Sequence, residues 1–93
     1  MLEKEIEQKM KLFAEKKQGM LLKLFVPGEN GIPDRLLLMP NSKFSFVELK
    51  QKGKKPSKLQ KYYHKQLREK GFDVHVVDDV HLAEKVVDSY ASD

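Results

Sequence analysis

Two acidic side chains and one lysine are the residues whose types and spacing could do chemistry in this chain of 93 residues. Glu48 and Lys50 lie two positions apart in an expected strand, so their side chains point to the same face of a sheet. Leu49 points to the other face, while its carbonyl lies at the same edge as the two charged groups. Asp34 follows a turn that ends in Pro33, whose fixed φ presents the acid at a defined place at the sheet edge.

This combination is typical of a site that holds a divalent cation against a phosphate. Carboxylate oxygens suit Mg²⁺ or Mn²⁺, which bind phosphate oxygens directly. Such a cation polarises a phosphodiester and lowers the pKa of a bound water, while a nearby ammonium group can orient that water and offset charge in the transition state. The alternative is a solvated ion pair between Glu48 and Lys50, which has the same spacing. The joint occurrence of this pair with Asp34 and a basic loop is much rarer than the pair alone, and on these residues both the site and the ion pair stay open.

A lysine-rich loop follows the expected site directly. The chain carries a net charge of +4, and the positive charge is concentrated in this loop. Lysines next to phosphate chemistry would contact the DNA backbone and place it over the cation without reading bases. The alternative is a loop that serves only solubility. The expected DNA-binding residues are Lys52, Lys54, Lys55, Lys58 and Lys61.

The composition excludes several other kinds of protein. There is no cysteine, so disulfides, thiolate zinc sites and cysteine nucleophiles are excluded. No apolar run is long enough for a membrane span or an export signal, which predicts a cytoplasmic protein. No phosphate-loop motif occurs, so we expect no nucleotide cofactor. We also expect that none of His64, His75 and His81 binds metal, because they lack the spacing of ligands.

The elements that must position these residues are short and end at glycine or proline. The length predicts a single domain over residues 1–93, and the patterning predicts the element order αβββαβα. The first three strands should form an antiparallel meander, and a right-handed crossover should pair the fourth strand parallel to the third. Helices are expected over 2–18, between Ser57 and Gly71, and after Asp79, and strands over 20–26, 35–39, 44–50 and 72–77.

Two sequence blocks and a downstream glutamine resemble a known nuclease family. Residues 31–35 (GIPDR), residues 46–50 (FVELK) and Gln60 are similar to the PD-(D/E)xK nuclease motif and, more closely, to the virus-type replication-repair nuclease (VRR-NUC) domain of the stand-alone phage and bacterial type. The resemblance runs from about residue 3 to residue 78. It implies an α/β fold with a restriction-endonuclease-like αβββαβ core, in which helices flank a mixed four-stranded sheet, followed by a C-terminal helix.

The resemblance also implies an activity and roles for individual residues. Members hydrolyse phosphodiesters with a divalent metal and prefer branched or flapped DNA, and stand-alone members resemble Holliday-junction resolvases that act as homodimers. Asp34 and Glu48 would be metal ligands, with the Leu49 carbonyl as a third. Lys50 would be the catalytic lysine. Gln60 would position water, metal or phosphate; its alternative role is to complete a capping box with the serine three residues earlier.

The family also has a glutamate on its first helix, for which Glu3, Glu5 and Glu7 are candidates. At about 100° per residue, Glu5 falls inside the arc of about 160° that holds the apolar side chains, and the other two fall outside it. A carboxylate that faces the sheet needs a partner, and a metal would be a good one, so we expect Glu5 in the site. The alternative is an ion pair between Glu5 and Lys9, four residues on. The apolar positions that define the arc are Leu2, Ile6, Met10, Leu12 and Phe13.

The predicted function is that of a metal-dependent, structure-specific DNA endonuclease acting as a homodimer on branched or four-way-junction DNA. A four-way junction has approximate two-fold symmetry, which suits two equivalent sites. We expect the interface at apolar helix positions that the small sheet cannot cover, and Tyr62 and Tyr63 favour such packing, or the core, over base stacking. The alternatives are a non-catalytic DNA-binding module, a less specific flap nuclease or exonuclease, and a protein-interaction adaptor.

Overall fold

The helices and strands follow one another in the order that the sequence predicts. The structure, a computed structural model, describes residues 1–91 of the chain. None of the helices in this described part is long and apolar enough to cross a membrane. The elements are α1 (Glu3–Lys16), β1 (Met20–Lys23), β2 (Arg35–Met39), β3 (Lys43–Leu49), α2 (Lys58–Glu69), β4 (Val74–Val77) and α3 (Val80–Ser89).

The strands form one mixed sheet in the order β1-β2-β3-β4. β1 pairs antiparallel with β2 and β2 with β3, whereas β3 and β4 run parallel. The predicted meander and parallel crossover are therefore confirmed. β1 ends at Lys23 rather than at residue 26, but the amide of Leu24 still donates to the carbonyl of Asp34 at 2.9 Å. This bond holds the segment before β2 beside the end of β1.

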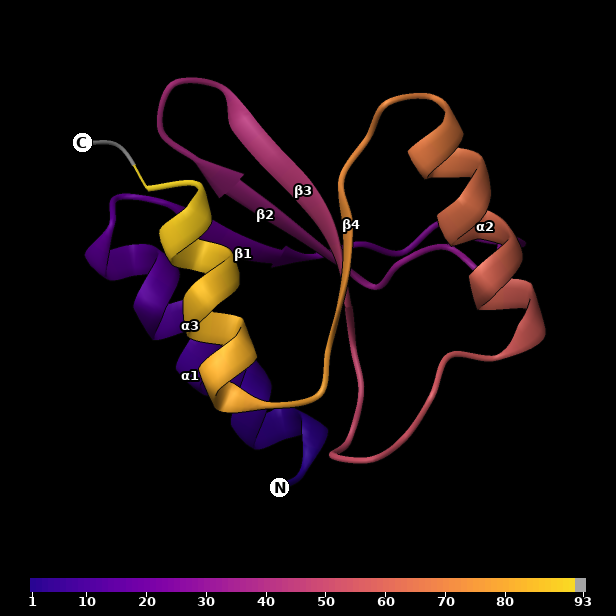
Figure 1. The fold of residues 1–93 in the computed structure, drawn as a ribbon, viewed down its shortest axis with the longest axis horizontal. Coiled ribbons are helices and arrows are strands. Elements are labelled where there is room, and N and C mark those ends of the chain that lie inside the picture. The colour runs from indigo at the N-terminus through magenta and orange to yellow at the C-terminus, as the bar shows by residue number, and fades with distance from the viewer. Residues whose placement is uncertain (92–93) are drawn as a thin grey trace.

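Two helices cover one face of the sheet and make the core with it (Figure 1). α1 buries every fourth residue, which is the spacing of one helix face, and α3 packs beside α1 with its own apolar side. Alternate residues of the strands complete this core, as the two-residue period of a strand requires. The buried side chains are Ile6, Met10, Ala14, Leu21, Leu37, Met39, Val47, Leu49, Val77, Ala83, Val86 and Val87.

α2 lies on the opposite face of the sheet (Figure 1). The helix begins with the predicted capping box: the hydroxyl of Ser57 accepts the amide of Gln60, and the amide of Ser57 donates to the side-chain oxygen of Gln60. His64 is the one side chain of α2 that is fully buried. Because that side chain is polar, α2 adds little to the apolar core.

The loop between β1 and β2 packs against α2. Gly31 lies so close to the helix that a side-chain carbon there would come within 2.5 Å of Tyr63 and 2.7 Å of Leu59. Only glycine, which has no such carbon, permits this approach. The hydroxyl of Tyr63 also donates to the carboxylate of Glu29 in the same loop. These contacts fix the loop that leads into Asp34.

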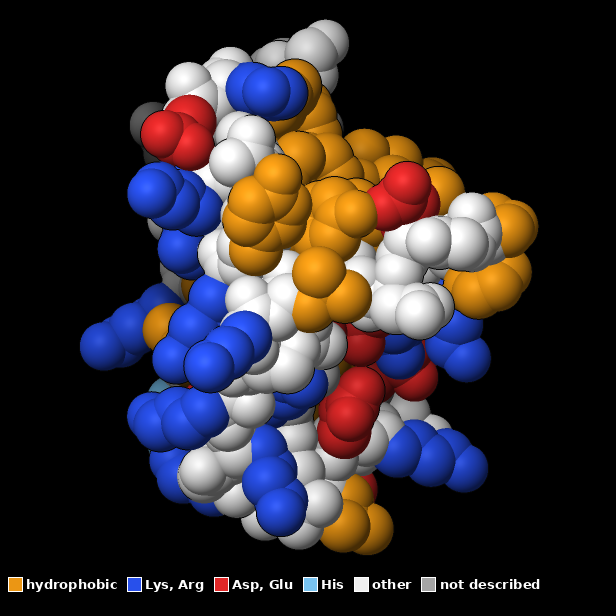
Figure 2. All heavy atoms as spheres, turned by 90° about the vertical axis from the view of Figure 1, so that its right-hand side faces the viewer, with side chains coloured by type: hydrophobic (Ala, Val, Ile, Leu, Met, Phe, Trp, Pro, Cys, Tyr) orange, Lys and Arg blue, Asp and Glu red, His pale blue; other side chains and the backbone are white. Residues whose placement is uncertain are grey.

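The rest of the α2 side of the sheet is uncovered. Phe44, Phe46 and Phe72 contact one another at ring-centroid distances of 5.8 to 5.9 Å, and Phe44 and Phe72 remain 37% and 39% exposed. Figure 2, which shows this side, has hydrophobic side chains gathered in its upper part and lysines along the lower left. The strand register adds outward residues of β1 and β2 to the same surface. We call it the apolar sheet face; its members are Met20, Leu22, Leu36, Leu38, Phe44, Phe46 and Phe72.

Candidate active site

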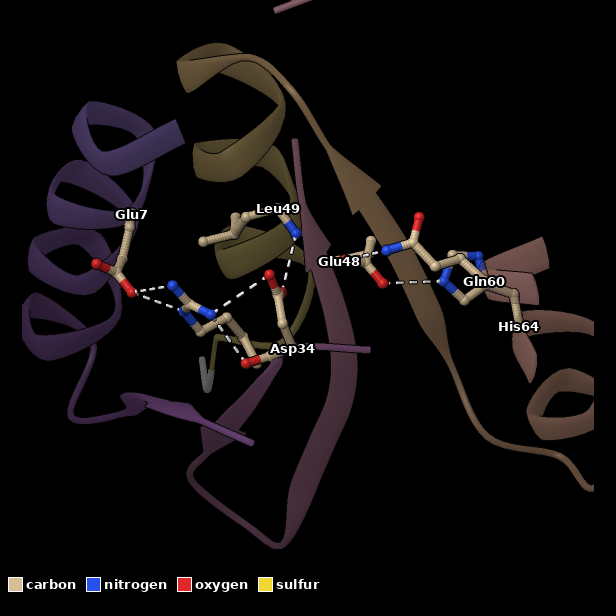
Figure 3. A network of polar contacts seen from close by, with 7 residues as sticks. Glu7, Asp34, Glu48, Leu49, Gln60 and His64 are labelled. Atoms are coloured by element: carbon tan, nitrogen blue, oxygen red, sulfur yellow. Dashed lines mark hydrogen bonds and ion pairs between the residues drawn. The ribbon is translucent and has the colours of Figure 1, made fainter. Parts of the chain in front are cut away.

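The sheet register brings together two acids that are well separated in sequence. β2 and β3 are antiparallel, so the start of β2 lies beside the end of β3, with Arg35 paired to Val47. Asp34 directly precedes β2, and Glu48 is the second-last residue of β3. The amide of Leu49 donates to Oδ1 of Asp34 at 3.1 Å and joins the two segments (Figure 3). The expected site therefore lies at this end of the sheet.

Asp34 is a partly buried carboxylate with a partner on each oxygen. Oδ1 accepts the amide of Leu49, and Oδ2 lies 3.4 Å from the guanidinium of Arg35. Burial raises the pKa of Asp34, while the Leu49 amide and the Arg35 charge oppose the rise. The net shift is upward, so these partners do not fully compensate for the lost hydration.

Glu48 is the more deeply buried acid, with 2% of its surface exposed. The side-chain nitrogen of Gln60 donates to its Oε2 at 3.3 Å, and Nε2 of His64 lies 3.4 Å from its Oε1 (Figure 3). Burial raises the pKa of Glu48 to about 7, and the negative charge of Asp34 is the next cause. Two neighbouring carboxylates that both resist ionisation form a place where a bound cation would stabilise the charged forms.

Gln60 completes the predicted helix cap and also contacts Glu48, while its role toward water, metal or phosphate stays a prediction. Its side-chain oxygen accepts the amide of Ser57 at 2.8 Å, which completes the helix cap, while its side-chain nitrogen donates to Glu48. One rotamer of Gln60 makes both contacts because the cap uses the oxygen of the amide group and Glu48 uses its nitrogen. The start of α2 is thereby tied to the end of β3.

Lys50 lies at the same end of the sheet and is partly buried. Its amide donates to the carbonyl of Val77 at 2.9 Å, which fixes its backbone against β4. Its positive charge opposes the burial-driven rise in the pKa of both Asp34 and Glu48. The predicted group of two acids and one lysine is therefore close enough to interact electrostatically.

The prediction that Glu5 faces the sheet is wrong. Glu5 is exposed, and its Oε1 accepts the amide of Leu2 at 3.0 Å at the start of α1. The predicted arc was misplaced because it counted Leu2 and Leu12, each of which is 58% exposed. The buried side of α1 is centred elsewhere, on Ile6, Met10 and Ala14. At about 100° per residue this centre lies far from Glu5 and near the two glutamates that the arc left out.

Those two glutamates, Glu3 and Glu7, are the acids of α1 on the side of the site. Arg35 donates from Nε to Oε2 of Glu7 at 2.6 Å and from Nη1 to the carbonyl of Asp34 at 3.0 Å (Figure 3). The charge of Glu3 adds to the raised pKa of Glu48, after burial and Asp34. From the sequence, Glu3 and Glu7 are candidates but Glu5 is selected, and Arg35 has no predicted role, although Arg35 closes the GIPDR block and the two acids are four residues apart on one helix face.

His64 is a further residue that sequence reasoning missed. It contacts Glu48, and burial, followed by the charges of Arg68 and Lys50, lowers its pKa, which favours the neutral ring. The available signal was its spacing, since His64 follows Gln60 by four residues and such residues share a helix face. The expectation that no histidine binds metal stays a prediction.

The lysine-rich loop is anchored to the start of α3. Lys52 forms an ion pair with Oδ2 of Asp79 at 2.8 Å, and the amide of Gly53 donates to Asp78 at 3.3 Å. Of the predicted DNA-binding residues, Lys52 is thus engaged within the chain. The others are exposed and form no ion pair within residues 1–91; they are Lys54, Lys55, Lys58 and Lys61.

The donors at this end of the sheet fit a hard divalent cation. Among the described residues, no group of three or more His, Cys, Asp or Glu side chains is spaced to hold a metal ion. The side-chain donors would therefore be Asp34 and Glu48, with the Leu49 carbonyl as the predicted third ligand. All are oxygen donors, the class that Mg²⁺ and Mn²⁺ bind, and such ions keep several waters. The raised pKa values of Asp34 and Glu48 are consistent with a cation site, because a bound cation would supply the positive charge that the two carboxylates lack.

Comparisons with known proteins point in the same direction. The profile of the VRR-NUC domain family matches residues 3–80. The "Putative nuclease p44" of Acyrthosiphon pisum secondary endosymbiont phage 1 is 38% identical over 81 residues, which are 87% of this chain and 87% of that protein. A solved structure described as a VRR-NUC domain matches with a TM-score of 0.85 at 28% identity, over 97% of this chain and 99% of that one. The predicted α/β architecture with its C-terminal helix is confirmed.

Proposed function

The chain belongs to the VRR-NUC domain family and is thereby a nuclease, and from this premise we propose its chemistry and substrate. The proposed activity is hydrolysis of DNA phosphodiesters by a divalent-metal-dependent, structure-specific endonuclease. The proposed substrate is branched DNA, above all the four-way (Holliday) junction. The proposed working form is a homodimer in the cytoplasm of a bacterial or phage-infected cell.

The observation that carries this proposal is the buried pair of acids beside Lys50. Burial raises the pKa of both Asp34 and Glu48, the charge of Asp34 raises that of Glu48 further, and the opposing charges of Arg35 and Lys50 only partly offset these shifts. A purely structural ion-pair network would instead balance these charges, because an uncompensated buried charge is strongly destabilising. The geometry therefore supports a site that is completed by a cation.

Each residue has a separate task in the proposed reaction. Asp34 and Glu48, with the Leu49 carbonyl, would hold Mg²⁺ or Mn²⁺, and the bound ion supplies polarisation of the phosphodiester and acidification of water. Lys50 orients the attacking water and offsets the negative charge that grows on the phosphate. Gln60 restrains the Glu48 carboxylate from the α2 side. The water oxygen bonds to phosphorus as one ester P–O bond breaks, which leaves a phosphomonoester and a hydroxyl end.

Exposed lysines support DNA as the substrate. Lys54 and Lys55 lie in the loop after β3, Lys58 and Lys61 lie at the start of α2, and no acid of the described residues forms an ion pair with any of them. Contacts of lysine with phosphates position a duplex without reading its sequence, which suits an enzyme that recognises branch structure.

The homodimer has a candidate interface on the apolar sheet face. The sequence placed the interface at apolar helix positions, of which Leu59 and Tyr62 on α2 are 48% and 56% exposed. The apolar sheet face offers a surface of aliphatic and aromatic side chains with no charged member, and a second copy would cover it isologously. Phe44→Glu should convert a dimer to a monomer in size-exclusion chromatography with light scattering, whereas Leu59→Glu should leave it dimeric. The reverse result would place the interface on α2.

The activity is tested by cleavage of a four-way junction with Mg²⁺, alongside flap, linear duplex and circular substrates. Lys50→Ala should lower the cleavage rate by roughly 10²–10³-fold, the usual cost of losing one group that stabilises transition-state charge. Its affinity for the junction should stay within about twofold, because the lysines of the loop are intact. Lys85→Ala, which removes an exposed lysine of α3, is the matched control and should cut like the parent.

Three outcomes would count against the proposal. Equal cutting by Lys50→Ala and the parent removes the role of the lysine. Junction binding by the parent without cutting, at any divalent-metal concentration, favours the non-catalytic DNA-binding module. Equal cutting of linear duplex and junction favours the less specific flap nuclease or exonuclease.

A further inference from the structure

The single fully buried side chain of α2 is a histidine that faces the carboxylate of the site. His64 and Glu48 are each 2% exposed, and Nε2 of the ring lies 3.4 Å from Oε1 of the acid. A position that packs a helix onto a sheet ordinarily carries an aliphatic side chain, which buries apolar surface without leaving a polar group to satisfy. An imidazole at this position needs a polar partner, and the structure gives it Glu48.

Gln60 and His64 together engage both oxygens of the acid. The two residues are one helical turn apart, so their side chains leave α2 on the same face. Gln60 donates to Oε2 of Glu48 at 3.3 Å, while His64 contacts Oε1 at 3.4 Å (Figure 3). Rotation of the carboxylate would break at least one of these contacts. α2 therefore restrains the plane of this carboxylate from outside the strand that carries it.

We infer that His64 is a positioning residue of the site, which with Gln60 fixes the Glu48 carboxylate in the orientation that a cation requires. The inference rests on the proposed function, because it assumes that Glu48 is a metal ligand. Each carboxylate oxygen has two lone pairs, so a contact to His64 leaves capacity for a second partner. Partners that orient a ligand in this way typically contribute about 10–100-fold to metal affinity or activity.

Binding of Mn²⁺ to the full chain without DNA tests this role, measured by the loss of the electron paramagnetic resonance signal of the free ion. His64→Gln keeps an N–H donor at a reach close to that of the imidazole Nε2, and His64→Leu fills the space with no donor. We expect His64→Gln to bind Mn²⁺ within about threefold of the parent and His64→Leu to bind about 10–100-fold more weakly. Junction cleavage at limiting Mn²⁺ should fall in the same order.

The matched control is His75→Leu, which removes a partly buried histidine that contacts Tyr90 rather than the site. Its Mn²⁺ affinity should equal that of the parent. An equal loss of affinity in His75→Leu and His64→Leu overturns the inference, because the loss would then follow from destabilisation alone. The inference is also overturned if His64→Leu binds Mn²⁺ with the affinity of the parent. It is overturned as well if His64→Gln binds Mn²⁺ as weakly as His64→Leu.

A second variant decides the question if His64→Leu does not fold. Asparagine has the same amide as glutamine but is one bond shorter, so His64→Asn should bind Mn²⁺ about as weakly as expected for the leucine variant. Parental affinity in His64→Asn overturns the inference. A parent that neither binds Mn²⁺ nor cuts any DNA overturns the proposed function and this inference with it. A parent that binds and cuts, with a histidine variant that matches it, overturns the inference alone.

Discussion

Two clusters in this molecule combine a histidine with an acid, and they are arranged in opposite ways. At the candidate site His64 contacts Glu48, and both the histidine and the acid are 2% exposed. At the other cluster His75 contacts the hydroxyl of Tyr90 at 2.6 Å, and that hydroxyl donates to Asp73 at 2.6 Å. Here the acid is exposed, and the hydroxyl of the half-buried tyrosine lies between the acid and the half-buried histidine.

The two clusters differ in whether the buried ionisable group is costly to charge. Burial, with Asp34 as the next cause, raises the pKa of Glu48 to about 7, so its charged form is the costly one. In the second cluster burial, followed by the hydrogen bond to Asp73, raises the pKa of Tyr90 to about 12, so this hydroxyl stays a neutral donor. That cluster ties the end of α3 to β4 with its polar groups satisfied. The same residue types thus form part of the proposed site in one place and a structural tie in the other.

The largest expected effect is on cleavage. Glu48→Gln keeps the size of the side chain and removes its charge, so cleavage of the junction should fall by roughly 10²–10³-fold or more. Tyr90→Phe removes the hydroxyl of the other cluster and should cut within about twofold of the parent at a temperature where both are folded. Rates measured at saturating Mg²⁺ check both. A comparable loss of activity in Tyr90→Phe would erase the distinction between the clusters.

The next effect is on stability without metal. The pKa of Glu48 is about 7 in the folded chain against an ordinary value of 4.5, so the folded chain binds more protons between these values. The free energy of unfolding should therefore fall as pH rises from 4.5 to 7, by up to about 3 kcal/mol from this group. Glu48→Gln should lack this decrease. Urea unfolding in EDTA at several pH values measures it as the difference between parent and variant.

Tyr90→Phe is the control for that measurement. Loss of its hydrogen bonds should cost about 1–2 kcal/mol. Tyr90 itself does not titrate in this range, so any change of this cost with pH comes from its partner His75, whose pKa burial lowers. Parallel curves for the parent and Glu48→Gln would show that the acid at the site is as well balanced as the second cluster.

The sequence predicts the fold and much of the site because those features depend on local rules. Strand alternation places Glu48 on the face that α2 approaches, and the turn chemistry of residues 31–35 places Asp34 at the mouth of β2. The capping box at Ser57 and the cap at Asp79, whose carboxylate accepts the amide of His81 at 2.7 Å, follow from residue type and spacing. Each of these features is decided within a few residues.

The features that sequence reasoning missed depend on which surfaces a small domain leaves uncovered. Leu2 and Leu12 of α1 and Phe44 of β3 are apolar yet exposed, because a chain of this size has too few elements to bury every apolar side chain. Because the predicted buried face of α1 included these two leucines, it was turned away from the true one, and Glu5 was selected over Glu3 and Glu7. His64 was missed for a related reason: its spacing from Gln60 indicates a shared helix face, but not that this face packs against Glu48 of β3.

The smallest expected effect separates two lysines of one loop. Lys54 is exposed and forms no ion pair within residues 1–91, so Lys54→Ala should weaken junction binding and reduce the slope of log affinity against log salt by about one. Lys52 is already paired with Asp79, so Lys52→Ala should leave that slope unchanged and slightly lower the melting temperature. Fluorescence anisotropy of a labelled junction at several salt concentrations measures the slopes. Equal slopes for the two variants would mean that DNA displaces the ion pair between Lys52 and Asp79. The difference between a paired lysine and an unpaired one would then not matter for DNA binding by this loop.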